Sequence, residues 1–161
     1  MVATDWLVLL LVSAVSTWLA WGRHPVVAVV VIVASLTVSA ALFLPGPEVR
    51  ALFGQPAVSL AESLARRTPW TVGQLGHVVG FAGFTMLLWW LRPDLRVWRL
   101  LLVLLALAVG AEAMQMLTPS REARLGDVYA NLIGIGAGLA FAVPLTALWA
   151  RHRRRGRRPR R

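Results

Sequence analysis

The sequence predicts an all-α fold, a polytopic membrane bundle of about five transmembrane helices. Hydrophobic residues make up 58% of the 161 residues, and they are concentrated in long runs with few charges. A membrane-spanning helix needs about 20 mostly apolar residues, which these runs supply. A helix satisfies the backbone hydrogen bonds of such a run within the bilayer. The chain has no cysteine, which excludes disulfides and thiolate metal sites.

Five apolar runs are long enough to span the bilayer, and together they make a single membrane domain over residues 1–150. They cover about residues 2–21, 25–44, 71–91, 97–117 and 126–150. The first run lacks the positively charged start of a signal peptide, because its first charged side chain is Asp5, so we expect it to be retained. Pro144 lies inside the fifth run, where neighbouring helices can compensate for its missing hydrogen bond.

The arginines predict how the chain is oriented in the membrane. With an outer N-terminus and a cytoplasmic C-terminus, 12 arginines lie in cytoplasmic segments and five in outer segments, as the positive-inside rule requires. Eight of the 12 belong to the tail, residues 151–161, which we expect to be disordered. We expect this tail to attract anionic membrane lipids and not nucleic acid, because no aromatic or folded reader accompanies its charge.

The longest predicted outer loop covers residues 45–70. Within it, residues 58–67 read VSLAESLARR and place apolar side chains at helical spacing, with Glu62, Arg66 and Arg67 available for a polar face. This pattern predicts a short helix that lies on the membrane surface. A helix that binds a partner is the alternative.

Polar residues at the ends of three runs are expected to meet below the outer surface. Glu112 and Gln115 are three residues apart and share one helix face, and Asp127 and Asn131, four apart, share another. His77 lies at a matching depth in the third run. Because polar groups in the hydrocarbon face the interior of a bundle, these side chains should converge. With the arginine of the intervening loop, the ligand-binding candidates are His77, Glu112, Gln115, Arg121, Asp127 and Asn131. No comparable cluster is expected at the inner end, where the charged residues lie in loops.

Small residues are expected to bring these helices together. Gly76 and Gly80 in the third run, and Gly134 and Gly138 in the fifth, have the four-residue spacing that lets helix backbones approach closely. These four glycines are therefore predicted to be helix-packing positions.

A purely structural role of the polar residues is the main alternative. Glu112 and Arg121 could form an ion pair that pins the hairpin between the fourth and fifth runs. Gln115 and Asn131 could supply interhelical hydrogen bonds, each worth roughly 0.6 kcal/mol on average. His77 could be a neutral imidazole packed in the interior.

The order of these polar residues resembles that of the VanZ-like family of bacterial membrane proteins. Over roughly residues 72–140, the residues that carry the resemblance are Glu112-x-x-Gln115, Pro119-x-Arg121, Asp127-x-x-x-Asn131-x-x-Gly134-x-x-x-Gly138 and an upstream His77-x-x-x-Phe81. Two features depart from the family pattern. The family often has an Asp-Lys pair just before the histidine, where this chain has Gly73 and Gln74, and Arg124 replaces a small polar or acidic residue.

The resemblance implies a multi-pass protein of the cytoplasmic membrane. The namesake of the family is associated with low-level resistance to teicoplanin-type glycopeptide antibiotics, by a molecular mechanism that is not established. A site that opens outward would fit action near cell-wall precursors or the drug.

Three classes of function follow from these observations. The first is a non-enzymatic membrane protein whose polar cluster binds an envelope lipid, a lipid-linked molecule or a glycopeptide-related ligand. The second is an intramembrane enzyme acting on an envelope lipid, with His77 and Glu112 or Asp127 as acid and base. No nucleophile accompanies them, which argues against this enzyme. No His-Glu-x-x-His motif or other set of zinc ligands is present in the sequence, so neither a metal nor a cofactor is expected. The third is a scaffold or small transporter, and a homo-oligomer is left open.

Overall fold

The described part of the chain consists of six helices and no strand, which confirms the predicted all-α fold. The computed structural model describes residues 3–43, 46–95, 97–116 and 125–156. In chain order, the helices are α1 (Ala3–Ala20), α2 (Pro25–Phe43), α3 (Gly46–Ala65), α4 (Val72–Leu91), α5 (Val97–Met116) and α6 (Leu125–Gly156). The five apolar runs correspond to α1, α2, α4, α5 and the greater part of α6.

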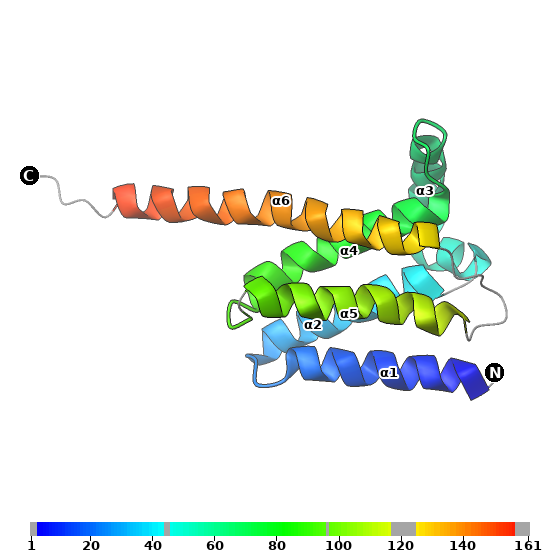
Figure 1. Ribbon diagram of the computed structural model, residues 1–161, viewed down its shortest axis with the longest axis horizontal. Coiled ribbons are helices and arrows are strands. Elements are labelled where there is room, and N and C mark those ends of the chain that lie inside the picture. Colours follow the sequence, from blue (N-terminus) through cyan, green and yellow to red (C-terminus); the bar gives the residue numbers. More distant parts are fainter. Residues whose placement is uncertain (1–2, 44–45, 96, 117–124, 157–161) are drawn as a thin grey trace, which may run out of the picture.

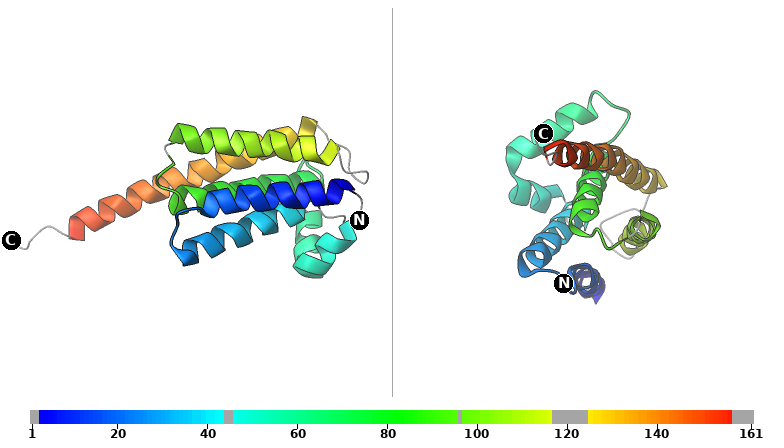
Figure 2. Two further views of the ribbon diagram at one scale, coloured as in Figure 1. Left: turned by 90° about the horizontal axis from the view of Figure 1, so that it is seen from below. Right: turned by 90° about the vertical axis from the view of Figure 1, so that its left-hand side faces the viewer.

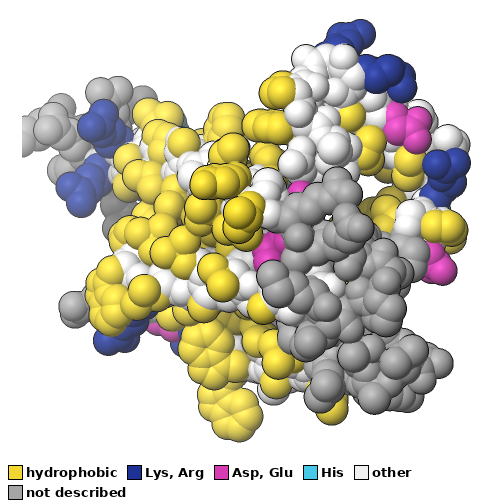
Figure 3. Space-filling model, turned by 45° about the vertical axis from the view of Figure 1, so that its right-hand side comes forward, with side chains coloured by type: hydrophobic (Ala, Val, Ile, Leu, Met, Phe, Trp, Pro, Cys, Tyr) yellow, Lys and Arg dark blue, Asp and Glu magenta, His cyan; other side chains and the backbone are white. Residues whose placement is uncertain are grey.

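The surface of the helices is apolar, as expected of a protein in lipid. Among the described residues, α2, α4 and the Leu125–Arg154 part of α6 are long and apolar enough to cross a membrane, and Leu10–Ala20 of α1 is a shorter apolar helix. Large hydrophobic side chains such as Val33 and Phe141 are exposed. On the face in Figure 3, hydrophobic side chains cover the helices, and the basic side chains lie toward the two ends. Five crossings and the direction of insertion remain predictions.

Helix α4 lies in the middle of the bundle. It packs along α6 on one side and against α2 on the other, while α1 packs on α2, and α5 contacts α6 and α4 (Figures 1 and 2). The buried residues of α4 that fill the core include Phe81, Phe84 and Leu88. The starts of α4 and α6 and the end of α5 lie at the end of the bundle that carries α3 (Figure 1). This arrangement places the polar residues of three helices at one end.

The start of α4 is fixed by a capping box. The Thr71 hydroxyl accepts a hydrogen bond from the backbone N–H of Gln74 (3.2 Å), and the Gln74 side chain accepts one from the backbone N–H of Thr71 (3.0 Å). These bonds satisfy two N–H groups that the first helical turn leaves without partners. The capping box thereby sets the direction in which α4 enters the bundle and the face on which His77 lies.

The glycines of α6, rather than those of α4, account for the close contact between these helices. A Cβ atom on Gly134 would lie 2.6 Å from the carbonyl oxygen of Val78, and one on Gly138 would lie 2.6 Å from that of Ala82. Only glycine fits at such backbone separations. A Cβ on Gly80 would make an ordinary 3.6 Å contact with α2. Among the described residues, nothing lies within 4 Å of such an atom on Gly76, so the predicted packing role of Gly76 is wrong there.

Helix α3 is longer than the predicted surface helix. It begins at Gly46 instead of within residues 58–67, and none of its residues is buried. It is broken at Gly54, which has φ 79° and ψ 158°, and Pro56 follows. The positive φ favours glycine at this position, and the break changes the direction of the helix.

The final helix also differs from expectation. α6 has 32 residues and continues to Gly156, so residues 151–156 of the tail are helical and not disordered. Arg153 stacks over the ring of Trp149, with its guanidinium carbon 3.7 Å from the ring centroid. Such cation–π contacts stabilise exposed pairs by about 0.5–1 kcal/mol. The last part of α6 runs beyond the other helices (Figure 1).

A second polar cluster lies at the opposite end of the bundle, where none was expected. The Arg92 side chain is buried; it donates to Asp94 (Nη2–Oδ2, 2.9 Å) and to the carbonyl oxygen of Leu19. Asp94 also pairs with Arg23 (3.0 Å). The hydrogen bond from Arg92, aided by the charge of Arg23, lowers the pKa of the Asp94 carboxyl. The cluster joins the α1–α2 turn to the α4–α5 turn. The predicted loop positions of these charged residues gave no indication that they contact one another.

Candidate functional site

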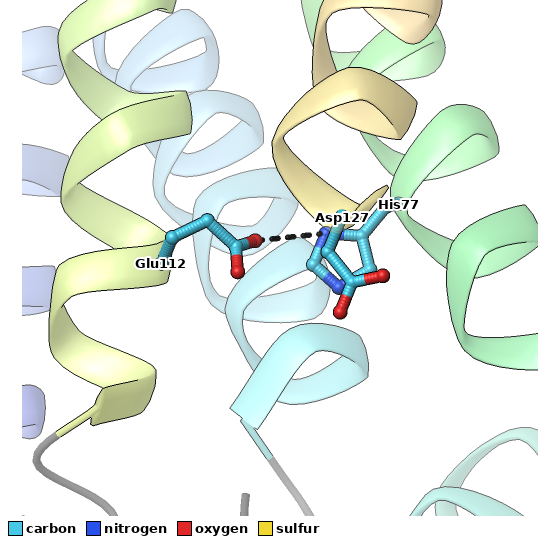
Figure 4. A group of neighbouring side chains, drawn as sticks. All are labelled: His77, Glu112 and Asp127. Carbon is cyan, nitrogen blue, oxygen red and sulfur yellow. Dashed lines mark ion pairs between the residues drawn. The ribbon is translucent and has the colours of Figure 1, made fainter. Parts of the chain in front are cut away.

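Three helices contribute buried polar side chains to one place. His77 lies in the second turn of α4, Glu112 in the last two turns of α5 and Asn131 in the second turn of α6, and all three are buried. Figure 4 shows Glu112 directed from α5 toward the His77 ring, with Asp127 of α6 beside the ring. These four residues are called the polar cluster below. The structure therefore brings His77, Glu112, Asp127 and Asn131 together, as predicted.

Asn131 connects the three helices through its amide. Its Nδ2 donates to the carbonyl oxygen of Ala108 (3.3 Å) and to Oε1 of Glu112 (3.4 Å), both on α5. Its Oδ1 lies 2.7 Å from Nδ1 of His77 on α4. The side chain is 0% exposed, and both ends of the amide are engaged, which is what a buried polar group requires.

The orientation of this amide determines which nitrogen of His77 carries a proton. Both contacts of Nδ2 are with oxygen acceptors, so Oδ1 is the atom that faces the ring, and Oδ1 can only accept. Nδ1 of His77 is therefore the donor, and in the neutral ring Nε2 carries the lone pair. Nδ1 also lies 3.7 Å from Oε1 of Glu112, an ion pair when the ring is protonated. The network thus presents a ring whose orientation and tautomer are both fixed.

Asp127 adds a second carboxylate to the polar cluster. It precedes Asn131 by one turn on the same face of α6 and is half-buried. One imidazole nitrogen of His77 and one carboxylate oxygen each from Glu112 and Asp127 lie within 4.8 Å of one another. A nitrogen and two carboxylate oxygens in one place are donors that can hold a divalent cation. The expectation of no metal site considered only ligand spacing along the chain, whereas these residues come from three helices.

An apolar cavity of about 390 Å³ lies between α1, α2, α4 and α5, and its lining residues include none of the polar cluster. Its wall includes Phe81, one turn after His77, and Ala111, the neighbour of Glu112. Leu42, at the end of α2, lines the same region. Three serines and one glycine line the cavity, and all its other lining residues are apolar. The cavity therefore has a nonpolar interior, and its wall includes residues one position from Glu112 and one turn from His77 along their helices.

Ser35 is the one polar lining residue of this cavity whose side chain is buried and has no hydrogen bond in the described structure. It is 7% exposed, and its hydroxyl oxygen has no partner among the described residues. Leaving a buried hydroxyl unsatisfied costs about 1–3 kcal/mol. A molecule in the cavity with a polar group at this depth could satisfy it.

Most of this chain matches the model of one known family. The VanZ/LLP1 family model matches residues 6–149. The chain belongs to the VanZ/LLP1 family. The match includes most of α1 and all of α2, which lie outside the residues 72–140 that carry the motif resemblance. No match was found among the curated proteins or among the solved structures.

One predicted site residue of this VanZ/LLP1 protein forms its hydrogen bond outside the polar cluster. Gln115 is 1% exposed, and its Nε2 donates to the carbonyl oxygen of Leu42 (3.0 Å). Gln115 therefore ties α5 to the last turn of α2, beside the cavity. Arg121 lies outside the described residues. Gln74, one of the departures from the family pattern, is used in the capping box of α4.

Some features of the VanZ/LLP1 site were missed from the sequence. The carbonyl oxygens of Ala108 and Leu42 accept hydrogen bonds, but every residue has a carbonyl, so the sequence carries no signal for them. The cavity depends on how four helices pack, which apolar composition does not specify. The proximity of Asp127 to His77, in contrast, was predicted, because Asp127 lies one turn before Asn131 on the same face.

Proposed function

We propose that this protein is a non-enzymatic component of the bacterial cytoplasmic membrane that binds an amphipathic envelope ligand, such as a lipid-linked phosphate. The apolar chain of the ligand would occupy the cavity between α1, α2, α4 and α5, and its headgroup would meet the polar cluster. The observation that supports this most directly is the position of the cavity, whose wall reaches the residue next to Glu112.

The size and lining of the cavity support an apolar ligand. Its volume of about 390 Å³ falls within the roughly 300–1,000 Å³ typical of small-molecule sites. Apolar lining favours the burial of hydrocarbon. Ser35, with an unpartnered buried hydroxyl in the described structure, provides a polar contact within the wall. The neighbouring amide, imidazole and carboxylates could hydrogen-bond a headgroup.

We further propose that the polar cluster lies toward the outer face of the membrane and that the C-terminus is cytoplasmic. The α3 end carries the polar cluster, and the opposite end carries Arg23, Arg92 and the arginine-rich end of α6 (Figure 1). Arginine enrichment on the cytoplasmic side supports this direction. A ligand would then be received from the outer leaflet, near cell-wall precursors.

Lipid binding can be tested with the purified full-length protein in detergent. We expect a polyprenyl monophosphate to bind saturably by native mass spectrometry and to compete with phosphatidylglycerol. Ser39→Phe would place a ring in the cavity, because Ser39 lines it, and should abolish the saturable component. Ala140→Phe is the matched control, because Ala140 is exposed on α6 and does not line the cavity.

The result that would overturn the proposal is binding that is equally weak or unsaturable in the wild type, Ser39→Phe and Ala140→Phe. Such behaviour would be that of annular lipid on an apolar surface and not of a ligand in the cavity. Saturable binding lost in both phenylalanine variants would also count against the cavity, since the exposed site should tolerate the ring.

A role in glycopeptide resistance is the physiological form of this proposal. In a teicoplanin-susceptible bacterium, we expect expression of the wild type to raise the inhibitory concentration of the drug. Glu112→Gln, Arg121→Ala and Asn131→Ala should lose that protection while accumulating normally in the membrane. If all three variants protect as well as the wild type, the polar residues are not the site. If the wild type gives no protection, the link to glycopeptides fails while lipid binding stands on its own measurement.

A further inference from the structure

We infer that His77, Glu112 and Asp127 form a binding site for one divalent transition-metal ion, Zn²⁺ or Mn²⁺. The ion would sit at the α3 end of the bundle, where α4, α5 and α6 meet (Figure 4). The inference rests on the geometry and chemistry of these side chains, and it does not depend on the identity of any lipid.

The donor set suits a transition metal. It offers one imidazole nitrogen and two carboxylate oxygens. Imidazole favours Zn²⁺ and its neighbours, carboxylates favour Mn²⁺ and Mg²⁺, and Zn²⁺ accepts both kinds of donor. A site with three protein ligands leaves at least one coordination position for water or another molecule. The mixed set therefore favours Zn²⁺ or Mn²⁺ over Ca²⁺, which binds oxygen donors.

The separations are close to those that a bound ion requires. The three donor atoms lie within 4.8 Å of one another. Two atoms bound to one Zn²⁺ at about 2.0–2.2 Å lie roughly 3–4 Å apart. Closure around an ion therefore needs movements of about 1 Å, which side-chain rotation can supply. The ligands lie on three packed helices, so their backbones need not rearrange.

Asn131 holds the histidine in the form that a metal needs. Metal-bound histidines usually donate their second ring N–H to an oxygen, which fixes the tautomer and the ring orientation. Here Nδ1 of His77 lies 2.7 Å from Oδ1 of Asn131, which accepts its proton. Nε2 is then the nitrogen with the lone pair, the form in which imidazole coordinates a metal. Oε1 of Glu112 lies 3.7 Å from Nδ1, so binding through Nε2 requires the Glu112 carboxylate or the His77 ring to turn. Asn131 is a positioning residue in this arrangement, because it acts through His77.

The charges of the site also suit an ion. Glu112 is 4% exposed and His77 3%, so the bundle would shield a cation here from solvent. A divalent cation balances the charges of both carboxylates at once. The open coordination position would face a phosphate oxygen of the headgroup, and this last step alone rests on the proposed function.

The experiment measures metal bound to the full-length protein, purified in detergent with an affinity tag other than polyhistidine. The protein is stripped with a chelator, dialysed against Zn²⁺ or Mn²⁺, and analysed for bound metal per chain. We expect about one ion per wild-type chain and at least a tenfold loss of affinity in His77→Gln, Glu112→Gln and Asp127→Asn. Loss of an outer-shell partner typically lowers metal affinity about 10–100-fold, so Asn131→Ala should weaken binding by roughly tenfold.

Matched controls separate this site from adventitious binding. His24→Gln removes an exposed histidine, and Glu62→Gln removes an exposed carboxylate, both outside the polar cluster. Both controls should bind metal as the wild type does. A second measurement uses Co²⁺, whose visible absorption reports an inner-sphere nitrogen–oxygen site and should change in His77→Gln but not in His24→Gln. An unchanged elution volume shows that each variant is folded.

The inference is overturned if folded wild type retains no metal after dialysis, or if the bound metal survives in Glu112→Gln and Asp127→Asn. It is also overturned if His24→Gln removes the metal. Metal binding without saturable lipid binding would uphold this site and reject the proposed function. Saturable lipid binding without metal binding would reject this site and uphold the proposed function.

Discussion

Nδ1 of His77 lies 2.7 Å from Oδ1 of Asn131, and this hydrogen bond joins two helices whose paired residues are 54 positions apart in the sequence. The same amide donates to Glu112 and to the Ala108 carbonyl on α5. A single buried side chain therefore connects α4, α5 and α6 at the end of the bundle that holds the polar cluster.

Replacing Asn131 should destabilise the bundle. Asn131→Ala leaves buried polar groups of His77 and Glu112 without the amide, at an expected cost of about 1–3 kcal/mol. The loss is measurable as a lower midpoint of thermal unfolding in detergent. Ile133→Ala, at an exposed position of α6, is the control and should change the midpoint little.

Asn131→Asp tests the assignment of the amide atoms. It keeps the oxygen that faces His77 but replaces Nδ2 with an oxygen that faces two acceptors, at 3.3 and 3.4 Å. Two oxygens without a proton between them repel, so this variant should be no more stable than Asn131→Ala. Wild-type stability in Asn131→Asp would mean that the donor role given to Nδ2 is wrong.

The contact between α4 and α6 predicts different results at two glycines of one helix. Gly138→Ala would place Cβ 2.6 Å from the Ala82 carbonyl oxygen, so the helices must separate, at an expected cost of about 1–3 kcal/mol. Gly136→Ala meets nothing within 4 Å among the described residues and should be neutral or stabilising by up to about 1 kcal/mol. Thermal unfolding of the two variants beside the wild type makes the comparison. Equal destabilisation would indicate an effect of helix propensity and not of packing.

The sequence was sufficient to predict the helices and the approximate place where polar residues meet. Long apolar runs leave the backbone no alternative to helix in lipid, so α1, α2, α4 and α5 lie close to their predicted bounds. The spacing of Glu112 and Asn131 near the ends of consecutive runs indicated a common depth. These are properties of the local chain, and they require no knowledge of how the helices pack.

What the sequence could not predict depends on packing between helices. A glycine pattern shows that a helix can be approached closely, but not which glycines lie at the contact. Gly76 was therefore predicted to lie in the α4–α6 contact, where Gly134 and Gly138 supply the close approach. Gln115 lies on the same face of α5 as Glu112, but its side-chain amide donates to the carbonyl oxygen of Leu42 on α2. Arg92 follows α4 as a loop residue would, but its side chain turns back into the bundle.

The cluster at the opposite end of the bundle predicts a dependence on pH. The pKa of Asp94 is lowered in the folded protein by the hydrogen bond from Arg92, with a further contribution from the charge of Arg23. The stabilisation is therefore present above the ordinary pKa of the carboxyl, 3.8, and is lost as the pH falls through the lower folded value. Asp94→Asn should be less stable than the wild type at neutral pH, and the difference should shrink as the pH falls below 3.8.

The difference should be small, because the Asp94 side chain is 37% exposed and solvent screens the pair. Added salt should reduce it further. Thermal unfolding of both proteins over the pH range, at low and high salt, provides the measurement. A difference that grows as the pH falls would contradict the assigned direction of the pKa shift.

Thr146 links the two neighbouring tryptophans of α4 to α6. Its hydroxyl oxygen accepts hydrogen bonds from the indole N–H groups of Trp89 (3.0 Å) and Trp90 (3.1 Å). Thr146→Val keeps the shape of the side chain but removes this acceptor, so we expect a loss of about 1–2 kcal/mol and a changed tryptophan emission. Thr146→Ser retains the hydroxyl and should preserve the emission. If the valine variant matches the serine variant in both respects, the two hydrogen bonds contribute nothing.

The arginines of the tail should determine the direction in which the chain inserts. Because the protein has no native cysteine, single cysteines can be labelled without background. Ser59→Cys places a thiol on exposed α3, and His24→Cys places one in the turn at the opposite end. With a membrane-impermeant maleimide, we expect Ser59→Cys to react in intact cells and His24→Cys to react only after lysis.

Deletion of residues 151–161 removes eight arginines and leaves four on the predicted cytoplasmic side against five on the other. The positive-inside rule then no longer favours one direction, so both cysteines should react partially in intact cells. The helical residues 151–156 place the first of these charges at the end of α6, close to where the headgroups of the inner leaflet would lie. A truncated chain that keeps the labelling pattern of the full chain would show that Arg23 and the α4–α5 turn are sufficient to orient it. Reversed labelling of the full-length chain would place the polar cluster on the cytoplasmic side.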